Sequence, residues 1–195
     1  MSNKEIETEK NSEKETSGTK ENSTARNILG TIAYIAGVCI FVFLILHFVG
    51  QRTVVNGNSM DTTLANGQNL VMDKLSYRFH DPKRYDIIIF PGPEEEGMHP
   101  YYIKRIIGMP GETVQIKDGK VYINDSSTPL DDSFIPEKMT GNYGPYKVPE
   151  NCYFMLGDNR NNSNDSRFWK NKFVRFDQLV GKAVVRYYPS IKWLG

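Results

Sequence analysis

The sequence is poor in cysteine and histidine, the side chains that most often build disulfide frameworks and metal sites. It has two cysteines and three histidines in 195 residues. Cys39 lies inside a long apolar run and Cys152 lies far beyond it, so we expect no disulfide between them. The histidines show no ligand spacing, and neither an HExxH nor a CxxC motif occurs. We therefore expect no metal site and no cofactor.

The sequence also lacks an excess of charge of either sign. Its formal net charge is +1 at pH 7, whereas nucleic-acid-binding domains carry a clear basic excess. We therefore expect no nucleic-acid partner. A chain of 195 residues has room for one ordinary domain with attachments, and such a domain can bury a stable core without disulfides.

The first 49 residues divide into two segments of opposite composition. Residues 1–27 are polar and charged, and we expect them to form a disordered tail. Residues 28–49 contain no Asp, Glu, Lys or Arg, and about 20 apolar residues suffice to cross the hydrocarbon core as a helix. No small-x-small cleavage site follows, so we interpret this run as a retained transmembrane anchor rather than a cleaved signal.

Positive charge near the ends of the apolar run predicts its orientation. Lys14, Lys20 and Arg26 precede the run, whereas only Arg52 follows it closely. Basic flanks stay in the cytoplasm. We expect a cytoplasmic N-terminus, a single pass through the cell membrane, and residues 50–195 on the extracellular side.

The sequence after the apolar run is predicted to be mainly β, with no long amphipathic helix. Asp118-Gly119 predicts a tight hairpin, because a type I′ turn needs two residues that tolerate positive φ. Residues 126–150 are rich in Pro, Gly, Asp and Tyr, and we expect them to be irregular. Short β-branched runs bounded by Gly, Pro and Asn predict strands at residues 52–55, 69–73, 86–90, 113–117, 120–124, 152–157 and 179–188.

A lysine stands among apolar neighbours in residues 102–107, which predict a further strand. Side chains alternate along a strand, so Tyr102, Lys104 and Ile106 share one face. One interpretation is an exposed lysine on an edge strand. The other is a lysine held against buried groups, whose pKa falls from about 10.4 toward the range of a general base. The neighbouring Arg105 stays protonated and cannot act in this way.

Two polar loops are candidates to accompany this lysine. Gly57 permits a tight loop that exposes Ser59, where a nucleophilic hydroxyl must lie for a peptide to approach it. The alternative is a turn residue or a helix cap. Residues 157–167 combine two aspartates, two arginines and several hydroxyl groups. This composition is typical of a surface loop of Asx turns, or of a loop fixed by ion pairs that offers a hydroxyl to a neighbour.

Three motifs follow one another along the chain. They are Ser59-Met60, then Tyr102-Ile103-Lys104-Arg105 leading to Gly108-x-Pro110-Gly111, then Gly157-Asp158-Asn159-Arg160-x-Asn162-Ser163-x-Asp165-Ser166-Arg167. In order and character they resemble the motifs of the type I signal peptidases, and the strand at residues 86–90 is similar to a further strand of that family. The resemblance covers residues 28–195, and the single apolar run is like that of the short Gram-positive bacterial members.

This resemblance implies a signal-peptidase-type antiparallel β catalytic domain behind one N-terminal transmembrane helix. It implies a serine endopeptidase, with Ser59 as the nucleophile and Lys104 as the general base. Ser163 is expected to hydrogen-bond the Lys104 amine. Asp165 and Arg167 are expected to hold the loop by an ion pair. No cofactor is implied.

The resemblance also implies the substrates. The enzyme is expected to remove signal peptides from secretory preproteins at the lipid bilayer, near the protein-export machinery. It is expected to cut after small residues at the first and third positions before the scissile bond. The peptide is expected to bind as an added strand. The substrate-binding residues are expected to be Val54, Val55, Gly57, Met60, Leu64, Tyr102 and Ile103.

The sequence departs from the family pattern at three positions. Gly57 stands where some members have a side-chain hydroxyl that stabilises the oxyanion, so a main-chain amide or water is left for that task. Thr62 replaces a proline that would fix φ, and we expect a looser loop there. Tyr85 stands where the family strand has a glycine before the aspartate, here Asp86.

Two other functions fit parts of the sequence. A non-catalytic signal-peptidase-like assembly factor for surface structures would share the fold, but it has no need of Ser59 or Lys104. A self-cleaving repressor would share the Ser/Lys pair, but the apolar run and the lack of a DNA-binding region exclude it.

Overall fold

The computed structural model describes residues 26–44, 50–93 and 101–195, and the chain divides into two compact units, residues 1–47 and 48–195. In the first unit the described residues form the helix Arg26–Leu44. Its 19 residues rise about 28 Å, close to the ~30 Å hydrocarbon core of a bilayer. Among the described residues it is the one helix that is long and apolar enough to cross a membrane, and its side chains are exposed. Most of the predicted tail, residues 1–25, and the end of the predicted anchor, residues 45–49, lie outside the described residues.

The second unit is built on an eight-stranded sheet in which neighbouring strands are antiparallel. This arrangement confirms the predicted fold class, a mainly β domain. β4 lies between β3 and β8 as an interior strand, and β1 forms an edge of the sheet. In spatial order the strands are β1 (Gly50–Val54), β2 (Asn69–Asp73), β10 (Gly181–Tyr188), β3 (Ile87–Phe90), β4 (Tyr102–Gly108), β8 (Cys152–Leu156) and β9 (Val174–Arg175), with β11 (Lys192–Trp193) paired to β10.

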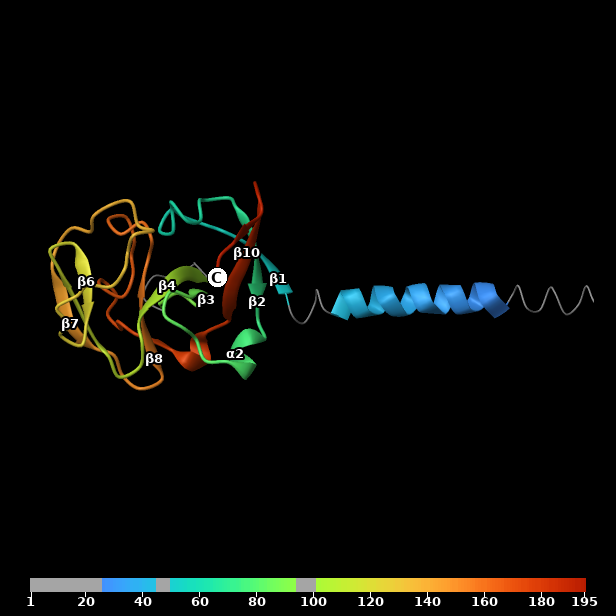
Figure 1. Cartoon of the computed structure of the whole chain (residues 1–195), viewed down its shortest axis with the longest axis horizontal. Coiled ribbons are helices and arrows are strands. Elements are labelled where there is room, and N and C mark those ends of the chain that lie inside the picture. The colour runs from blue at the N-terminus through green and yellow to red at the C-terminus, as the bar shows by residue number, and fades with distance from the viewer. Residues whose placement is uncertain (1–25, 45–49, 94–100) are drawn as a thin grey trace, which may run out of the picture. The chain divides into compact units, whose positions relative to one another are not determined.

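A second, three-stranded sheet has the order β6 (Lys120–Ile123), β5 (Thr113–Lys117), β7 (Tyr143–Lys147). Asp118 and Gly119 join β5 to β6 with φ values of 52° and 75°, which confirms the predicted hairpin turn. Figure 1 shows β6 and β7 at the end of the domain away from β1, β2 and β10, with β3, β4 and β8 between them. The only helices among the described residues after position 50 are α2 (Ser76–Phe79) and the 3₁₀ turn η2 (Phe176–Gln178).

Strand β7 corrects the expectation that residues 126–150 are irregular throughout. The strand contains Gly144 and Pro145, residues that disfavour strand assignment from sequence. Among the described strands it pairs with β5 alone and is therefore an edge of the small sheet. A proline is tolerated at an edge because its missing N–H removes no ladder bond on the open side.

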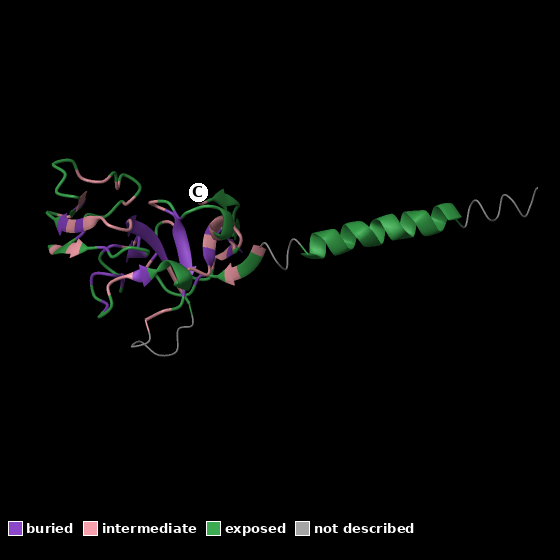
Figure 2. Cartoon of the chain, turned by 90° about the horizontal axis from the view of Figure 1, so that it is seen from below, coloured by how far each residue is buried: buried purple, intermediate pink, exposed green. Residues whose placement is uncertain are grey.

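Apolar side chains cover both faces of the interior strands. Ile87 and Ile89 pack in one buried cluster with Met60, while Ile88 and Phe90 pack in another. Figure 2 shows the buried segments concentrated in the middle of the domain. Because β3 is covered on both faces, it is a continuous apolar run rather than an alternating one. The same packing surrounds the neighbouring strand β4, which carries Lys104.

Candidate active site

A cavity of about 450 Å³ brings together three parts of the chain that are far apart in sequence. The end of β1 and the loop after it contribute Thr53, Val54 and residues 56–59. Residues 101–104 at the start of β4 form a second wall. Asn162 and Asn164, from the loop after β8, form a third. The cavity therefore contains Ser59 and Lys104, the two residues that the sequence singled out.

Lys104 lies on an interior strand, which excludes the interpretation of an exposed edge lysine. Its backbone pairs with Ile88 of β3, and its residue surface is 3% exposed. The Nζ atom lies 5.3 Å from the centre of the Tyr102 ring. Burial withdraws water from the ammonium group and so favours the neutral amine.

Ser59 is presented by a loop that is anchored in the core. Met60 and Leu64 are fully buried, and the Leu64 amide donates to the Met60 carbonyl at 2.7 Å. Gly57 has φ +97°, and its amide donates to Asn66 Oδ1 at 3.0 Å. This φ value lies in the left-handed region that glycine adopts without strain. The buried side chains hold the loop, while Ser59 faces the cavity.

The loop after β8 holds the Ser59 loop from the other side. The Asn159 amide donates to the Ser59 carbonyl at 3.0 Å, and its side-chain Nδ2 donates to the Asn58 carbonyl at 3.0 Å. A Cβ atom added at Gly157 would lie 2.4 Å from the Ser59 carbonyl and 2.2 Å from Ser163 Oγ. Only glycine permits this close approach of the two loops at position 157.

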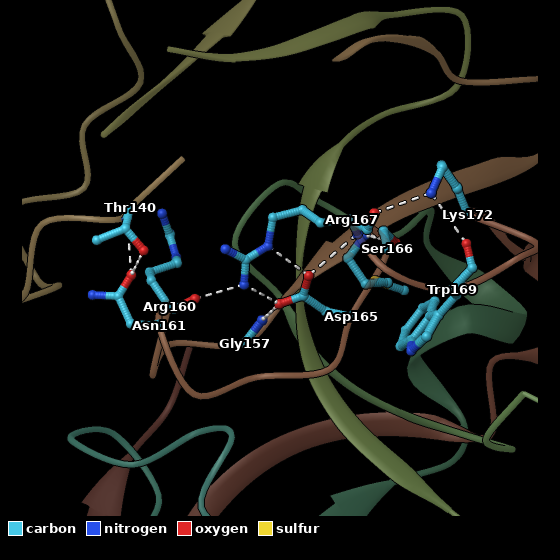
Figure 3. A network of polar contacts seen from close by, with 10 residues as sticks. Thr140, Gly157, Arg160, Asn161, Asp165, Ser166, Arg167, Trp169 and Lys172 are labelled. Carbon is cyan, nitrogen blue, oxygen red and sulfur yellow. Dashed lines mark hydrogen bonds and ion pairs between the residues drawn. The ribbon is translucent and has the colours of Figure 1, made fainter. Parts of the chain in front are cut away.

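Buried ion pairs fix the conformation of residues 157–167. The Arg167 guanidinium donates two bonds to the Asp165 carboxylate at 2.8 Å, and the same carboxylate accepts from the Gly157 amide at 3.1 Å (Figure 3). Arg167 Nη2 also donates to the Arg160 carbonyl at 2.6 Å. A single carboxylate therefore ties the start of the loop to its end.

Two further ion pairs were not predicted from the sequence, although Arg105, Asp158 and Arg160 stand in its motifs. Arg105 donates two bonds to the buried Asp158, at 2.8 and 2.5 Å, and so joins β4 to the loop after β8. Arg160 donates two bonds to Asp132, at 2.7 and 3.0 Å. The sequence signals for the first pair were the presence of Arg105 and Asp158 in the motifs and the position of Arg105 on the strand face opposite Lys104.

The structure does not contain the hydrogen bond expected between Ser163 and the Lys104 amine. Ser163 Oγ is buried and has no hydrogen-bond partner among the described residues. It packs instead beside the Cα atom of Gly157. The packing of Ser163 against Gly157 in the buried loop therefore leaves its hydroxyl without a donor or acceptor among the described residues.

The residues expected to bind substrate fall into two groups. Val54, Gly57, Tyr102 and Ile103 line the cavity. Val55, Met60 and Leu64 do not line it. They are buried in one apolar cluster, against which Ile103 packs from the cavity wall.

Two departures from the family pattern occupy unusual backbone conformations. Thr62 has φ +84°, and its amide donates to Asp61 Oδ1 at 3.0 Å. Proline, fixed near −65°, would not fit this conformation. Tyr85 has φ +73°, a conformation natural to glycine, and its carbonyl accepts from Arg105 Nη1 at 2.8 Å. Burial and the nearby Asp132 carboxylate raise the pKa of the Tyr85 phenol.

The described residues contain no group of three or more His, Cys, Asp or Glu side chains that could hold a metal ion. The cavity instead offers the Ser59 hydroxyl, the buried Lys104 amine and several amides. Such a set can perform nucleophilic attack and proton transfer on a peptide carbonyl.

Comparison with known proteins gives the family. The model of the family described as signal peptidase, peptidase S26, matches residues 28–188. A probable signal peptidase I-2 from Synechocystis sp. is 37% identical over 179 residues, which are 90% of this chain and 80% of that protein. A signal peptidase I from Leptolyngbya laminosa is 41% identical, over 73% of this chain and 70% of that one.

The solved structures include a similar chain. The crystal structure of a signal peptidase I from Enterococcus faecalis V583 is 36% identical and covers 54% of this chain and 98% of its own, with a TM-score of 0.44. The family match spans most of the sequence and the curated relatives align over more than two thirds of their length. The chain therefore belongs to the signal peptidase family, peptidase S26, as a serine endopeptidase of the type I signal peptidases.

Proposed function

We propose that this serine endopeptidase removes signal peptides with a dyad made of Ser59 and Lys104. The observation that carries the proposal is the position of both residues in one cavity, with Lys104 buried on an interior strand. A buried amine is biased toward its neutral form, which is the form that accepts a proton.

In the proposed reaction, Ser59 Oγ attacks the carbonyl carbon of the scissile bond while neutral Lys104 takes the hydroxyl proton. The main-chain N–H of Ser59 stabilises the negative oxygen that forms. Lys104 then gives the proton to the leaving amine, and the carbon–nitrogen bond breaks, which leaves an acyl group on Ser59. Water attacks this ester with Lys104 again as the base, and Ser59 is restored as the acid product leaves.

The preprotein is proposed to bind as an extended strand beside β1. This strand is an edge of the large sheet among the described strands, and Thr53 and Val54 at its end line the cavity. An edge offers unpaired backbone groups to an incoming peptide. Val54, Tyr102 and Ile103 line the cavity together with Ser59, and they are proposed to restrict it to small side chains at the first and third positions before the cut.

The helix Arg26–Leu44 is proposed to anchor the enzyme in the cell membrane. Its length, composition and exposed apolar side chains support this role. The basic residues that precede it favour a cytoplasmic N-terminus, which places the catalytic domain on the extracellular side. There the enzyme would meet preproteins at the lipid bilayer as they leave the export machinery.

The test uses the full chain in detergent and a purified preprotein. We expect Ser59→Ala and Lys104→Ala each to lower kcat/KM by on the order of 10⁴-fold or more, because each removes one member of a unit that acts together. Lys104→Arg keeps the positive charge but cannot release a proton, and we expect the same loss.

Matched controls come from exposed positions of the same domain. Ser126→Ala and Lys120→Ala replace an exposed serine and an exposed lysine outside the cavity, and we expect activity to be unchanged. Cleavage by the Ser59→Ala and Lys104→Ala variants at the wild-type rate would refute the dyad. Substantial activity in Lys104→Arg would refute the general-base role alone.

A further inference from the structure

The side chain of Asn159 holds one of the two peptide groups that flank Ser59. Its Nδ2 donates to the Asn58 carbonyl at 3.0 Å, and its backbone amide donates to the next carbonyl, that of Ser59, at 3.0 Å. The Asn58 carbonyl also accepts from the Asp61 amide at 3.0 Å. Two successive peptide groups are thus fixed by one residue from a loop about 100 positions later in the chain.

The first of these peptide groups contains the Ser59 N–H. A peptide group is planar and trans, so its C=O and N–H point in opposite directions. Fixing the direction of the Asn58 carbonyl therefore fixes the direction of the Ser59 N–H. We propose that Asn159 is a positioning residue that aims the Ser59 N–H at the oxyanion of the reaction. This inference rests on the proposed role of Ser59 as the nucleophile.

Gly57 makes this alignment more important in this chain. Glycine at that position carries no side-chain hydroxyl, and a Cβ atom added there would have no neighbour within 4 Å. The Gly57 amide is already bonded to Asn66 Oδ1. The Ser59 N–H is thus the amide whose direction decides how well the negative oxygen is stabilised, and a misaligned donor loses much of its strength.

The rest of the loop is held without the Asn159 amide group. Gly157 and Asp158 on one side are fixed by Asp165 and Arg105. On the other side, the Asn162 amide donates to the Asn159 carbonyl at 3.0 Å. Removing the side-chain amide should therefore change the direction of the Ser59 N–H without unfolding the loop.

The test compares Asn159→Ala with Asn161→Ala in the full chain in detergent, with a preprotein as substrate. Asn161 is an asparagine of the same loop whose side chain bonds to Thr140 and to the Lys138 carbonyl instead. We expect Asn159→Ala to lower kcat about 10- to 100-fold with KM within about threefold. This is less than the 10²–10³-fold loss of a whole oxyanion donor, because the Asp61 amide still holds the Asn58 carbonyl. Asn161→Ala should stay within about twofold of wild type.

A second variant and a second probe separate alignment from a general structural effect. Asn159→Asp places a carboxylate oxygen against the Asn58 carbonyl, and we expect a larger loss of kcat than in Asn159→Ala. A substrate-derived peptide aldehyde forms a hemiacetal with Ser59 and places an oxygen at the oxyanion position. Its affinity should fall by the same factor as kcat/KM across these variants, while the midpoint of thermal unfolding stays within about 2 °C of wild type, since surface changes alter stability little.

Three results would overturn the inference: wild-type kcat in both Asn159 variants, a loss carried by KM alone, or an equal loss in Asn161→Ala. Unchanged aldehyde affinity in a slowed Asn159 variant would overturn it as well. Undiminished cleavage by Ser59→Ala would instead refute Ser59 as the nucleophile. This result distinguishes a failure of the proposed function from a failure of the inference about Asn159.

Discussion

Residues 157–167 and residues 126–142 are both stretches without helix or strand, yet they differ in burial. In the first stretch Asp158, Arg160, Asp165 and Arg167 are all buried, whereas the second is mostly exposed. Hydrophobicity does not explain the difference, because the mostly exposed stretch contains the apolar residues Leu130, Phe134, Ile135 and Met139, whereas residues 157–167 contain none. What separates them is whether each charge has a fixed partner, because a buried charge is tolerated only when it is paired and hydrogen-bonded.

The two stretches meet at one ion pair. Arg160 from the buried loop donates to Asp132 from the exposed stretch, and Asn161 accepts from the Thr140 amide. The exposed stretch therefore supplies the partner that one buried arginine needs. The comparison predicts that a substitution lowers the free energy of unfolding more when the charge that it leaves unpaired is more deeply buried.

The largest effect is expected from Arg167→Met. It leaves the fully buried Asp165 carboxylate without its guanidinium. Removing one partner of a buried pair costs about 3–5 kcal/mol, which should be visible as a lower midpoint of thermal unfolding of the full chain in detergent. The double variant Arg167→Met/Asp165→Leu removes both charges and should recover part of the loss. If the double variant is no more stable than the single one, the unpaired charge is not the cause.

A smaller effect is expected from Asp132→Asn. Arg160 is 2% exposed and depends on this carboxylate for two hydrogen bonds. Both bonds come from the terminal nitrogens Nη1 and Nη2, and the Nε atom has no hydrogen-bond partner among the described residues. The asparagine keeps one acceptor oxygen and removes the charge, so we expect a loss of about 1–3 kcal/mol in the free energy of unfolding. An unchanged unfolding curve would mean that the pair contributes nothing to the fold.

The smallest effect is expected from Asp131→Ala, one position before Asp132. Asp131 is exposed, and hydrogen bonds from the backbone amide and the side chain of the nearby Ser133 lower the pKa of its carboxyl group. An exposed carboxylate keeps its water in both states, so we expect no measurable change in the unfolding midpoint. A loss as large as that of Asp132→Asn would show that position in the segment, rather than burial of the partner, decides the outcome.

Local chemistry in the sequence was enough to predict several elements of the fold. The apolar run at residues 28–49 predicted a helix, and Asp118-Gly119 predicted a hairpin, because each depends on residues adjacent in the chain. The mainly β domain was predicted for the same reason. Strand β7 was missed because its pairing with β5, not its Gly144-Pro145 sequence, makes it a strand.

The site was predicted less completely than the fold. Its motifs indicated Ser59 and Lys104, but the partners of the buried arginines could not be read from the sequence. Arg105 and Asp158 are 53 positions apart, and the topology of β4 and β8 alone brings them together. The missing partner of the Ser163 hydroxyl also depends on packing between segments that are distant in the sequence.

The cavity is lined by two parts of the sheet that differ in the free energy needed to open them locally. Lys104 sits on β4, whose backbone is bonded to a strand on either side, whereas Ser59 sits on a loop that follows the border strand β1. Borders of a sheet open at lower free energy than its middle. Heat or denaturant below the unfolding midpoint would therefore move the hydroxyl away from the amine while the interior is still intact, so that catalysis is the first property the domain loses.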